Sequence, residues 1–348
     1  GIINASWGGT PVEAWVSEKG LQNFPEYVHQ KALYEDTELV SRITETERLH
    51  QQAWNKVLYK SDAGLHGVTP WYAEDYDDSD WEKVDMFSDN WAIRNGRPLN
   101  GVHWFRKDFF VPEDWSGKEA VLRLGCIVDA DSVFVNGHFV GTVSYQYPPR
   151  IYKVPSKLLK KGKNQLTVRL FSYGGRPSFV KEKPYKLICD GKEVNLEGGW
   201  KHKIGTVMPP SPSSTAFHYT PVGLYNGMIY PLCHYTFKGV VWYQGESNVG
   251  RWSEYSSLLS ALIADWRTLF KDETLPFYII ELADFLASDD PGRAAWAELR
   301  KQQAKTAREN AHVTLIKNSD TGEWNDIHPL DKKTAATRLV EAVIQNEK

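Results

Sequence analysis

The residues around position 240 combine a short apolar run, a polar turn and an amphipathic helix. The run at 240–243 (Val-Val-Trp-Tyr) predicts a buried strand, and it stops at a turn of mainly polar residues, 244–248 (Gln-Gly-Glu-Ser-Asn). Apolar residues then recur at i, i+3, i+4 and i+7 over residues 252–270, which predicts a helix with one apolar face. Open α/β sheets place their chemistry at such turns, at the carboxyl ends of strands. The alternative is a loop whose polar residues only cap the helix.

The same alternation continues through the second half of the chain. The pattern predicts strands over residues 239–243, 277–282 and 312–316, and helices over residues 252–270, 291–309 and 330–346. Strands that alternate with helices indicate a parallel sheet with helices on both faces. At the amino-terminal end we expect a short strand, a break at the double glycine, and one or two surface helices over residues 26–60.

Between these regions the helical spacing disappears. Residues 67–195 contain short alternating strands, and Asn136-Gly137 predicts a hairpin because both central positions of a type I′ turn need positive φ. Strands at this spacing favour a β-sandwich. We therefore predict an α/β domain over residues 1–66 and 196–348, interrupted by an all-β insert at 67–195.

Composition narrows the function classes. The net charge of −3 gives no indication of a nucleic-acid partner, and no apolar run is long enough to predict membrane insertion. Three scattered cysteines, and the absence of zinc, calcium, P-loop or dinucleotide motifs, predict neither a metal nor a cofactor. The 14 Trp and 17 Tyr suit sugar binding, or equally the cores of β-domains.

Two further loops carry candidate chemistry. The double glycine Gly8-Gly9 lets backbone N–H groups approach a ligand, as an oxyanion cradle or only as a tight turn. His328 follows the last predicted strand, where an imidazole suits a general base, and Asp326 is close enough to orient it. The alternative for this loop is that Asp326 caps the last helix and His328 lies at the surface.

Four blocks occur in an order that resembles the sialate O-acetylesterase family of SGNH-type carbohydrate esterases. These blocks are Ile3–Trp15 (INASWGGTPVEAW), Tyr225–Leu232 (YNGMIYPL), Val240–Asn248 (VVWYQGESN) and Asn325–Pro329 (NDIHP), and the helix from Tyr255 to Asp265-Trp266-Arg267 also matches. The resemblance implies an SGNH-like parallel sheet flanked by helices. For residues 67–195 it implies a galactose-binding-like jelly roll.

This resemblance also implies a chemistry, the removal of acetyl groups from sialic acid or another acetylated glycan. His328 would be the base, with Asp326 as its orienting partner. Gly8 or Gly9 would supply a backbone donor to the oxyanion, and Gln244 a side-chain amide.

The pocket and the compartment follow from the same resemblance. Trp7, Glu246 and Asn248 would bind the substrate or shape its pocket. A secreted or periplasmic location is expected only because the family has one.

The chain departs from the family pattern in two places. The family's nucleophile block is not found, so we expect the nucleophilic Ser upstream of Gly1, with Ser247 as the alternative within the chain. Asn325 stands at the usual position of the acid, three residues before the histidine. Glu323 and Asp320 therefore remain alternatives to Asp326.

These departures leave rival interpretations open. The chain could instead be a catalytically incomplete carbohydrate-binding protein on an esterase scaffold, or an acetylxylan-type esterase. The insert itself could bind sugar or only brace the catalytic domain.

Overall fold

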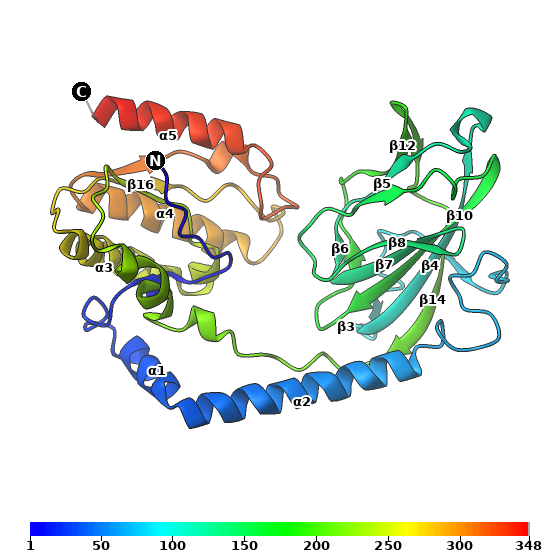
Figure 1. Cartoon of the computed structure of the whole chain (residues 1–348), viewed down its shortest axis with the longest axis horizontal. Helices are drawn as coiled ribbons and strands as arrows, with labels where there is room; N and C mark the ends of the chain where they lie inside the picture. Colours follow the sequence, from blue (N-terminus) through cyan, green and yellow to red (C-terminus); the bar gives the residue numbers. More distant parts are fainter. Residues whose placement is uncertain (347–348) are drawn as a thin grey trace. The chain divides into compact units, whose positions relative to one another are not determined.

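The computed structural model describes residues 1–346, which divide into two compact units (Figure 1). The first unit contains residues 1–45 and 214–348, and the second contains residues 46–213. Helix α2 (Thr37–Ser61) runs through the division between them.

The first unit is built on three parallel strands in the order β15 (Val240–Trp242), β16 (Phe277–Ile280) and β17 (Val313–Ile316). Helix α3 (Trp252–Phe270) connects the first two strands, and α4 (Arg293–Glu309) connects the last two. The other helices of this unit are α1 (Pro25–Glu35), α5 (Lys332–Asn346) and the short turns η1 (Val12–Trp15), η3 (Phe217–Tyr219), η4 (Tyr225–Ile229), η5 (Tyr230–Leu232), η6 (Glu246–Arg251) and η7 (Ser319–Thr321).

Both faces of this sheet are covered by helices, as predicted. Phe277 and Ile279 pack into a core with the apolar face of α3, whereas Tyr278 and Ile280 point to the other face and pack against α5. Period-2 alternation along β16 thus sends successive side chains into two different cores.

The second unit is a sandwich of two antiparallel sheets with a common core. The larger sheet has the order β1 (Glu82–Val84), β14 (Trp200–Val207), β4 (Gly101–Val111), β10 (Gly162–Ser172), β7 (Ala130–Val135), β8 (His138–Val143). The smaller has the order β13 (Lys192–Asn195), β12 (Tyr185–Cys189), β5 (Ala120–Leu124), β9 (Ile151–Val154). Two short pairs, β2 (Ile93–Arg94) with β3 (Arg97–Pro98) and β6 (Ile127–Val128) with β11 (Ser178–Phe179), and the turn η2 (Glu113–Trp115) complete it.

The predicted hairpin is present between β7 and β8. Its central residues Asn136 and Gly137 have φ of 48° and 78°, the left-handed conformation that a type I′ turn requires. Most of the tryptophans of this unit are buried, so its aromatic content is largely explained by its cores.

The predicted boundaries at 66 and 195 are narrower than the observed second unit. Trp54 and Leu58, in the second half of α2, pack with Trp71 and Trp104 of the sandwich unit. At the other end, β14 pairs with β4 inside the larger sheet. Side-chain packing and strand pairing therefore extend this unit to residues 46–213.

Two predictions for the strands of the first unit need correction. The strand expected at the amino terminus is irregular, and Ile2 is 97% exposed. The run at 240–243 is only half buried, since Val241 is 51% exposed while Trp242 is buried. An apolar run read from sequence does not show whether both faces of a strand are covered.

Candidate active site

The turn at Gly8-Gly9 lies against the turn that follows β15. The hydroxyl of Ser247 donates to the carbonyl of Gly9 at 2.6 Å, and the amide of Gln244 donates to the carbonyl of Thr10 at 2.9 Å. Gly9 has φ of 74°, and a Cβ built there would lie 2.6 Å from the phenol oxygen of Tyr219. Only glycine fits this position, so the double glycine forms a tight turn held at the carboxyl end of β15.

Gln244 is buried, and its side-chain amide already has three hydrogen-bond partners. Its Nε2 atom donates to the Thr10 carbonyl and to Oδ1 of Asn248 at 2.8 Å, and its Oε1 accepts from the phenol of Tyr255 at 3.0 Å. An amide nitrogen has two hydrogens, so none remains for an oxyanion. The prediction that Gln244 stabilises the oxyanion does not fit this arrangement.

Asn248 is fully buried, at 0% exposure. Its Oδ1 accepts from the backbone N–H of Val12 at 2.9 Å, and its Nδ2 donates to Glu13 at 3.0 Å. Glu13 also pairs with Arg251 at 2.5 Å. In this structure Asn248 joins the amino-terminal segment to the residues before α3, and its predicted part in substrate binding stays a prediction.

The backbone N–H groups of Gly8 and Gly9 remain as candidate donors. Both residues are exposed, and within residues 1–346 neither N–H donates to another group of the chain. Backbone donors that point to solvent from a rigid turn can bind a developing negative charge.

Glu246 relates the loop that contains His328 to the turn after β15. Burial raises the pKa of the Glu246 carboxyl, and the charges of His328 and Lys332 act in the opposite direction. A Coulombic effect of this kind requires proximity, so His328 and Glu246 belong to one electrostatic environment. The charges of the last loop thus act on the turn after β15, and a common pocket for the two loops stays a prediction.

His328 is 63% exposed in its side chain, which leaves the imidazole accessible. Its Nδ1 lies 3.9 Å from Oδ1 of Asp326, too far for a hydrogen bond. The same Oδ1 accepts instead from the backbone N–H of His328 at 2.9 Å. Asp326 therefore shapes the turn, and its role in orienting the imidazole stays a prediction.

The two alternatives to Asp326, Asp320 and Glu323, have different contacts. Asp320 forms a bidentate pair with Arg338 of α5 at 2.6 and 2.7 Å, and this hydrogen-bonded pair lowers the pKa of Asp320 to about 2. It is thus committed to α5. Glu323 forms an isolated antiparallel bridge with Asp326 across the loop.

Two residues that the sequence interpretation missed close the end of the sheet. Asn318 follows β17, and its amide donates to the phenol oxygen of Tyr243 and to the backbone carbonyl of Glu281, both at 3.1 Å. The carboxylate of Glu281 accepts from the backbone N–H groups of Asn318 and Ser319 at 3.2 and 3.1 Å. Each of these residues lies just after a predicted strand or at its end. That position could have marked them as candidate site residues in the sequence.

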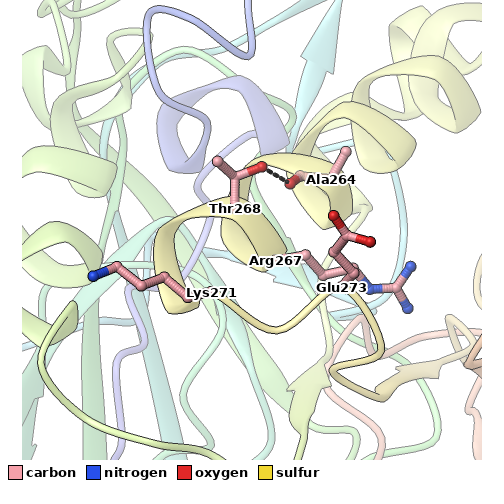
Figure 2. Close-up of a pocket in the computed structure, with 5 residues that line it drawn as sticks. All are labelled: Ala264, Arg267, Thr268, Lys271 and Glu273. Atoms are coloured by element: carbon pink, nitrogen blue, oxygen red, sulfur yellow. Dashed lines mark hydrogen bonds between the residues drawn. The ribbon is translucent and has the colours of Figure 1, made fainter.

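A separate hollow lies near the other end of α3 (Figure 2). It is lined by Ala264, Arg267, Thr268, Lys271 and Glu273. The guanidinium of Arg267 is occupied by the carbonyls of Leu275 and Ala311. Fifteen residues of helix rise by roughly 20 Å, so this hollow is remote from the turn at 244–248.

Within residues 1–346, no group of three or more His, Cys, Asp or Glu side chains is arranged to hold a metal ion. Within the same residues, no helix combines the length and apolar character of a membrane span.

Comparison with known proteins gives two family matches. Residues 204–345 match the profile of carbohydrate esterases described as sialic acid-specific acetylesterases. Residues 41–200 match the sugar binding domain of glycosyl hydrolases family 2. The two matches fall mainly on different units of the structure.

Individual relatives agree with the first match. Sialate O-acetylesterase of Homo sapiens is 35% identical over 135 residues, covering 33% of this chain and 25% of that protein. The protein of the same description from Rattus norvegicus is 34% identical over 176 residues, covering 45% and 30%. The matched region thus spans at most about a third of these relatives.

Among solved structures, a carbohydrate acetylesterase from Xanthomonas citri is 20% identical and covers 63% of this chain and 68% of that one. A β-glucuronidase from Ruminococcus gnavus is 19% identical and covers 34% and 22%. Their TM-scores, 0.33 and 0.24, are too low to assign a common fold. The resemblance expected from the sequence motifs is nevertheless confirmed by the curated relatives and by the profile, which matches residues 204–345.

Proposed function

We propose that this protein is a carbohydrate O-acetylesterase that removes acetyl groups from sialic acid or a related acetylated glycan. The observation that carries the proposal is the convergence of three separate loops. Gly9 bonds to Ser247, Thr10 bonds to Gln244, and His328 acts on the pKa of Glu246. The family match supports the reaction class.

The proposed reaction is acyl transfer to a serine. The serine oxygen attacks the acetyl carbonyl while His328 accepts the hydroxyl proton, and the carbonyl oxygen becomes an oxyanion. Collapse of the intermediate breaks the bond to the sugar oxygen, which leaves with the proton from His328. Water, activated by His328, then releases acetate and restores the serine.

The oxyanion donors in this proposal are the N–H groups of Gly8 and Gly9. They lie on a turn that is fixed by bonds from Ser247 and Gln244 to its carbonyls. Gln244 acts indirectly, because its amide holds the turn and does not reach the substrate. A donor held in place before the reaction stabilises charge without reorganisation.

Ser247 does not have the contacts expected of the nucleophile. Its hydroxyl donates to the Gly9 carbonyl, whereas an activated serine donates to its base. This contact favours a nucleophile other than Ser247. The proposed SGNH-type fold rests on the parallel order of β15, β16 and β17, and a periplasmic or secreted location rests on family resemblance alone.

Glu246 is the proposed electrostatic partner of His328. Asp326 is 3.9 Å from the imidazole and engaged with backbone, while the charge of His328 already influences Glu246. A carboxylate near the base stabilises the imidazolium that forms during the attack.

The decisive experiment uses the full-length protein with p-nitrophenyl acetate and with an O-acetylated sialic acid. His328→Ala should lower kcat by a factor of about 10³ or more, because it removes the base. His29→Ala, an exposed histidine of α1, is the control for the substitution itself. Unchanged turnover in His328→Ala, or no hydrolysis by the parent protein, contradicts the assignment.

A second candidate function is carbohydrate binding by the second unit. It is favoured by the match of residues 41–200 to a sugar binding domain. Calorimetry of the full chain with a glycan panel tests it. Heat of binding that survives in His328→Ala, with no ester hydrolysis in the parent, would favour binding over catalysis.

A further inference from the structure

Trp7 presents a large aromatic surface beside the Gly8-Gly9 turn. Its side chain is 51% exposed, although it stacks on the imidazole of His218 with ring centroids 5.0 Å apart and an interplanar angle of 26°. His218 is itself exposed and contacts the edge of Tyr219, with centroids 4.2 Å apart and an angle of 72°. Three rings from two distant segments therefore form one aromatic cluster, in which Trp7 and His218 are stacked and Tyr219 meets His218 edge-on.

This cluster is fixed at both ends to the turn. The hydroxyl of Thr10 donates to the backbone carbonyl of Trp7 at 2.8 Å and accepts from the indole of Trp15 at 2.9 Å. The phenol of Tyr219 donates to the carbonyl of Gly8 at 3.4 Å. The Trp7 backbone is thus tied to Thr10 at the end of the turn, and the Tyr219 ring to Gly8, one of the proposed oxyanion donors.

Holding the Trp7 ring exposed to water costs free energy unless a ligand covers the ring. About half of a large apolar ring faces water, and each Å² of such surface costs about 25 cal/mol relative to burial. The His218 ring supports one face of the indole, so the ring does not need to be ordered when a ligand arrives. A flat indole with a single N–H matches the apolar face and the hydroxyl rim of a pyranose.

We infer that Trp7, backed by His218, is a stacking subsite for the pyranose ring of the ester substrate. The inference rests on the proposed function for the identity of the reacting group. Trp7 directly precedes Gly8, so the indole and the proposed oxyanion donors belong to the same turn. His218 is a positioning residue here, since it acts through the orientation of Trp7.

Binding can be measured without any hydrolysis. Calorimetry with the full-length His328→Ala protein and methyl pyranosides, both neutral and carboxylate-bearing, should detect sugar binding. Introducing Trp7→Ala should weaken it at least tenfold, Trp7→Phe about threefold, and His218→Ala about three- to fivefold. Tyr235→Ala removes another tyrosine of the first unit, 58% exposed, and should leave the affinity unchanged.

Kinetics of the otherwise unaltered protein give an independent readout. Trp7→Ala should raise KM for an acetylated pyranoside about tenfold more than KM for p-nitrophenyl acetate, which has no sugar ring. Equal effects on the two substrates, or pyranoside affinity that is unchanged in Trp7→Ala, would overturn the subsite. Trp7-dependent sugar binding with no ester hydrolysis would overturn the proposed function but leave the subsite standing.

Discussion

The side-chain amide of Gln244 donates a hydrogen bond of 2.9 Å to the backbone carbonyl of Thr10, which lies 234 positions earlier in the chain. The same amide nitrogen donates to Asn248. Two residues of one motif therefore bind the backbone of another motif. The polar turn after β15 is first of all a clamp on the amino-terminal segment, and the candidate oxyanion donors depend on that clamp.

This clamp makes Asn248 a stability determinant. Asn248→Ala should lower the free energy of unfolding of the first unit by about 2–4 kcal/mol, because it leaves the Val12 N–H and the Glu13 carboxylate without a buried partner. Urea titration followed by tryptophan fluorescence measures this change. The exposed neighbour Ser247→Ala is the control and should cost less than about 1 kcal/mol. A similar loss in both variants would mean that the clamp contributes little.

Sequence reasoning located the site better than it assigned the roles within it. The motifs predicted one region for Gly9, Gln244 and His328, and sequence order alone was enough to pair the first turn with the turn that holds Gln244. It could not show that Gln244 and Asn248 satisfy buried backbone groups, because a glutamine that binds a ligand and one that binds a carbonyl look the same in sequence. Contacts between residues more than 230 positions apart are set by the fold and cannot be read from the local sequence.

The fold was predictable wherever the local pattern was strong. Helix α3 was predicted at its observed bounds, Trp252–Phe270, because an apolar stripe of 19 residues has a single interpretation. The predicted boundary at residue 66 differs from the observed one because the local pattern there has more than one interpretation. The stripe of α2 shows that the helix is amphipathic but not which unit its Trp54 and Leu58 pack against.

Replacing Glu246 by Gln should raise stability and lower activity. Burial raises the pKa of Glu246 in the folded state, so the folded protein binds the proton more tightly than the unfolded chain. The corresponding stability is present below the unfolded pKa and is lost as pH rises through the folded pKa. Glu246→Gln should therefore raise the Tm by a few degrees at pH 8 and by less at pH 4, as scanning calorimetry can show.

The same Glu246→Gln substitution should lower kcat/KM by a factor of about 10–100, since the proposed partner charge of His328 is lost. Glu309→Gln at the end of α4, where Glu309 is 57% exposed, is the control and should change neither quantity appreciably. Should Glu246→Gln be as active as the parent, Glu246 would not be the partner of the base.

In the sandwich, Asp131 and Arg150 form an ion pair at 2.7 Å with both side chains fully buried. The guanidinium also donates to the carbonyls of Ile127 and Pro148. Asp131→Asn should destabilise the second unit by about 3–5 kcal/mol, because it leaves a buried cation without its counter-charge.

The exposed pair of Lys118 and Asp190, also at 2.7 Å, provides the comparison for Asp131→Asn. Asp190→Asn should cost between about 0 and 1 kcal/mol, since solvent screens that pair. Urea titrations of the two variants, monitored by circular dichroism, measure the difference. Equal costs would show that burial adds nothing to the Asp131–Arg150 interaction.

Two stacked histidines should make the sandwich sensitive to acid. His103 and His202 are buried with Nδ1 and Nε2 2.9 Å apart, and His103 Nε2 donates to the Leu99 carbonyl at 2.8 Å. His103 Nδ1 is therefore the acceptor in the pair, and a proton there would break it. Burial lowers the pKa of His103 to about 4 and, with the neighbouring His103, that of His202 to about 3.

Both folded-state pKa values lie below the unfolded value of 6.5, so the unfolded chain binds more protons as the pH falls. The stability that these residues contribute is complete above about pH 6.5. It should decline by up to about 1.4 kcal/mol per pH unit for each histidine between pH 6 and 4. Urea titrations across this range measure the slope. His202→Gln should remove the contribution of one histidine to the slope of unfolding free energy against pH. His138→Gln on β8 is the control for the substitution itself. If His202→Gln keeps the parent slope, the pair does not control the acid response.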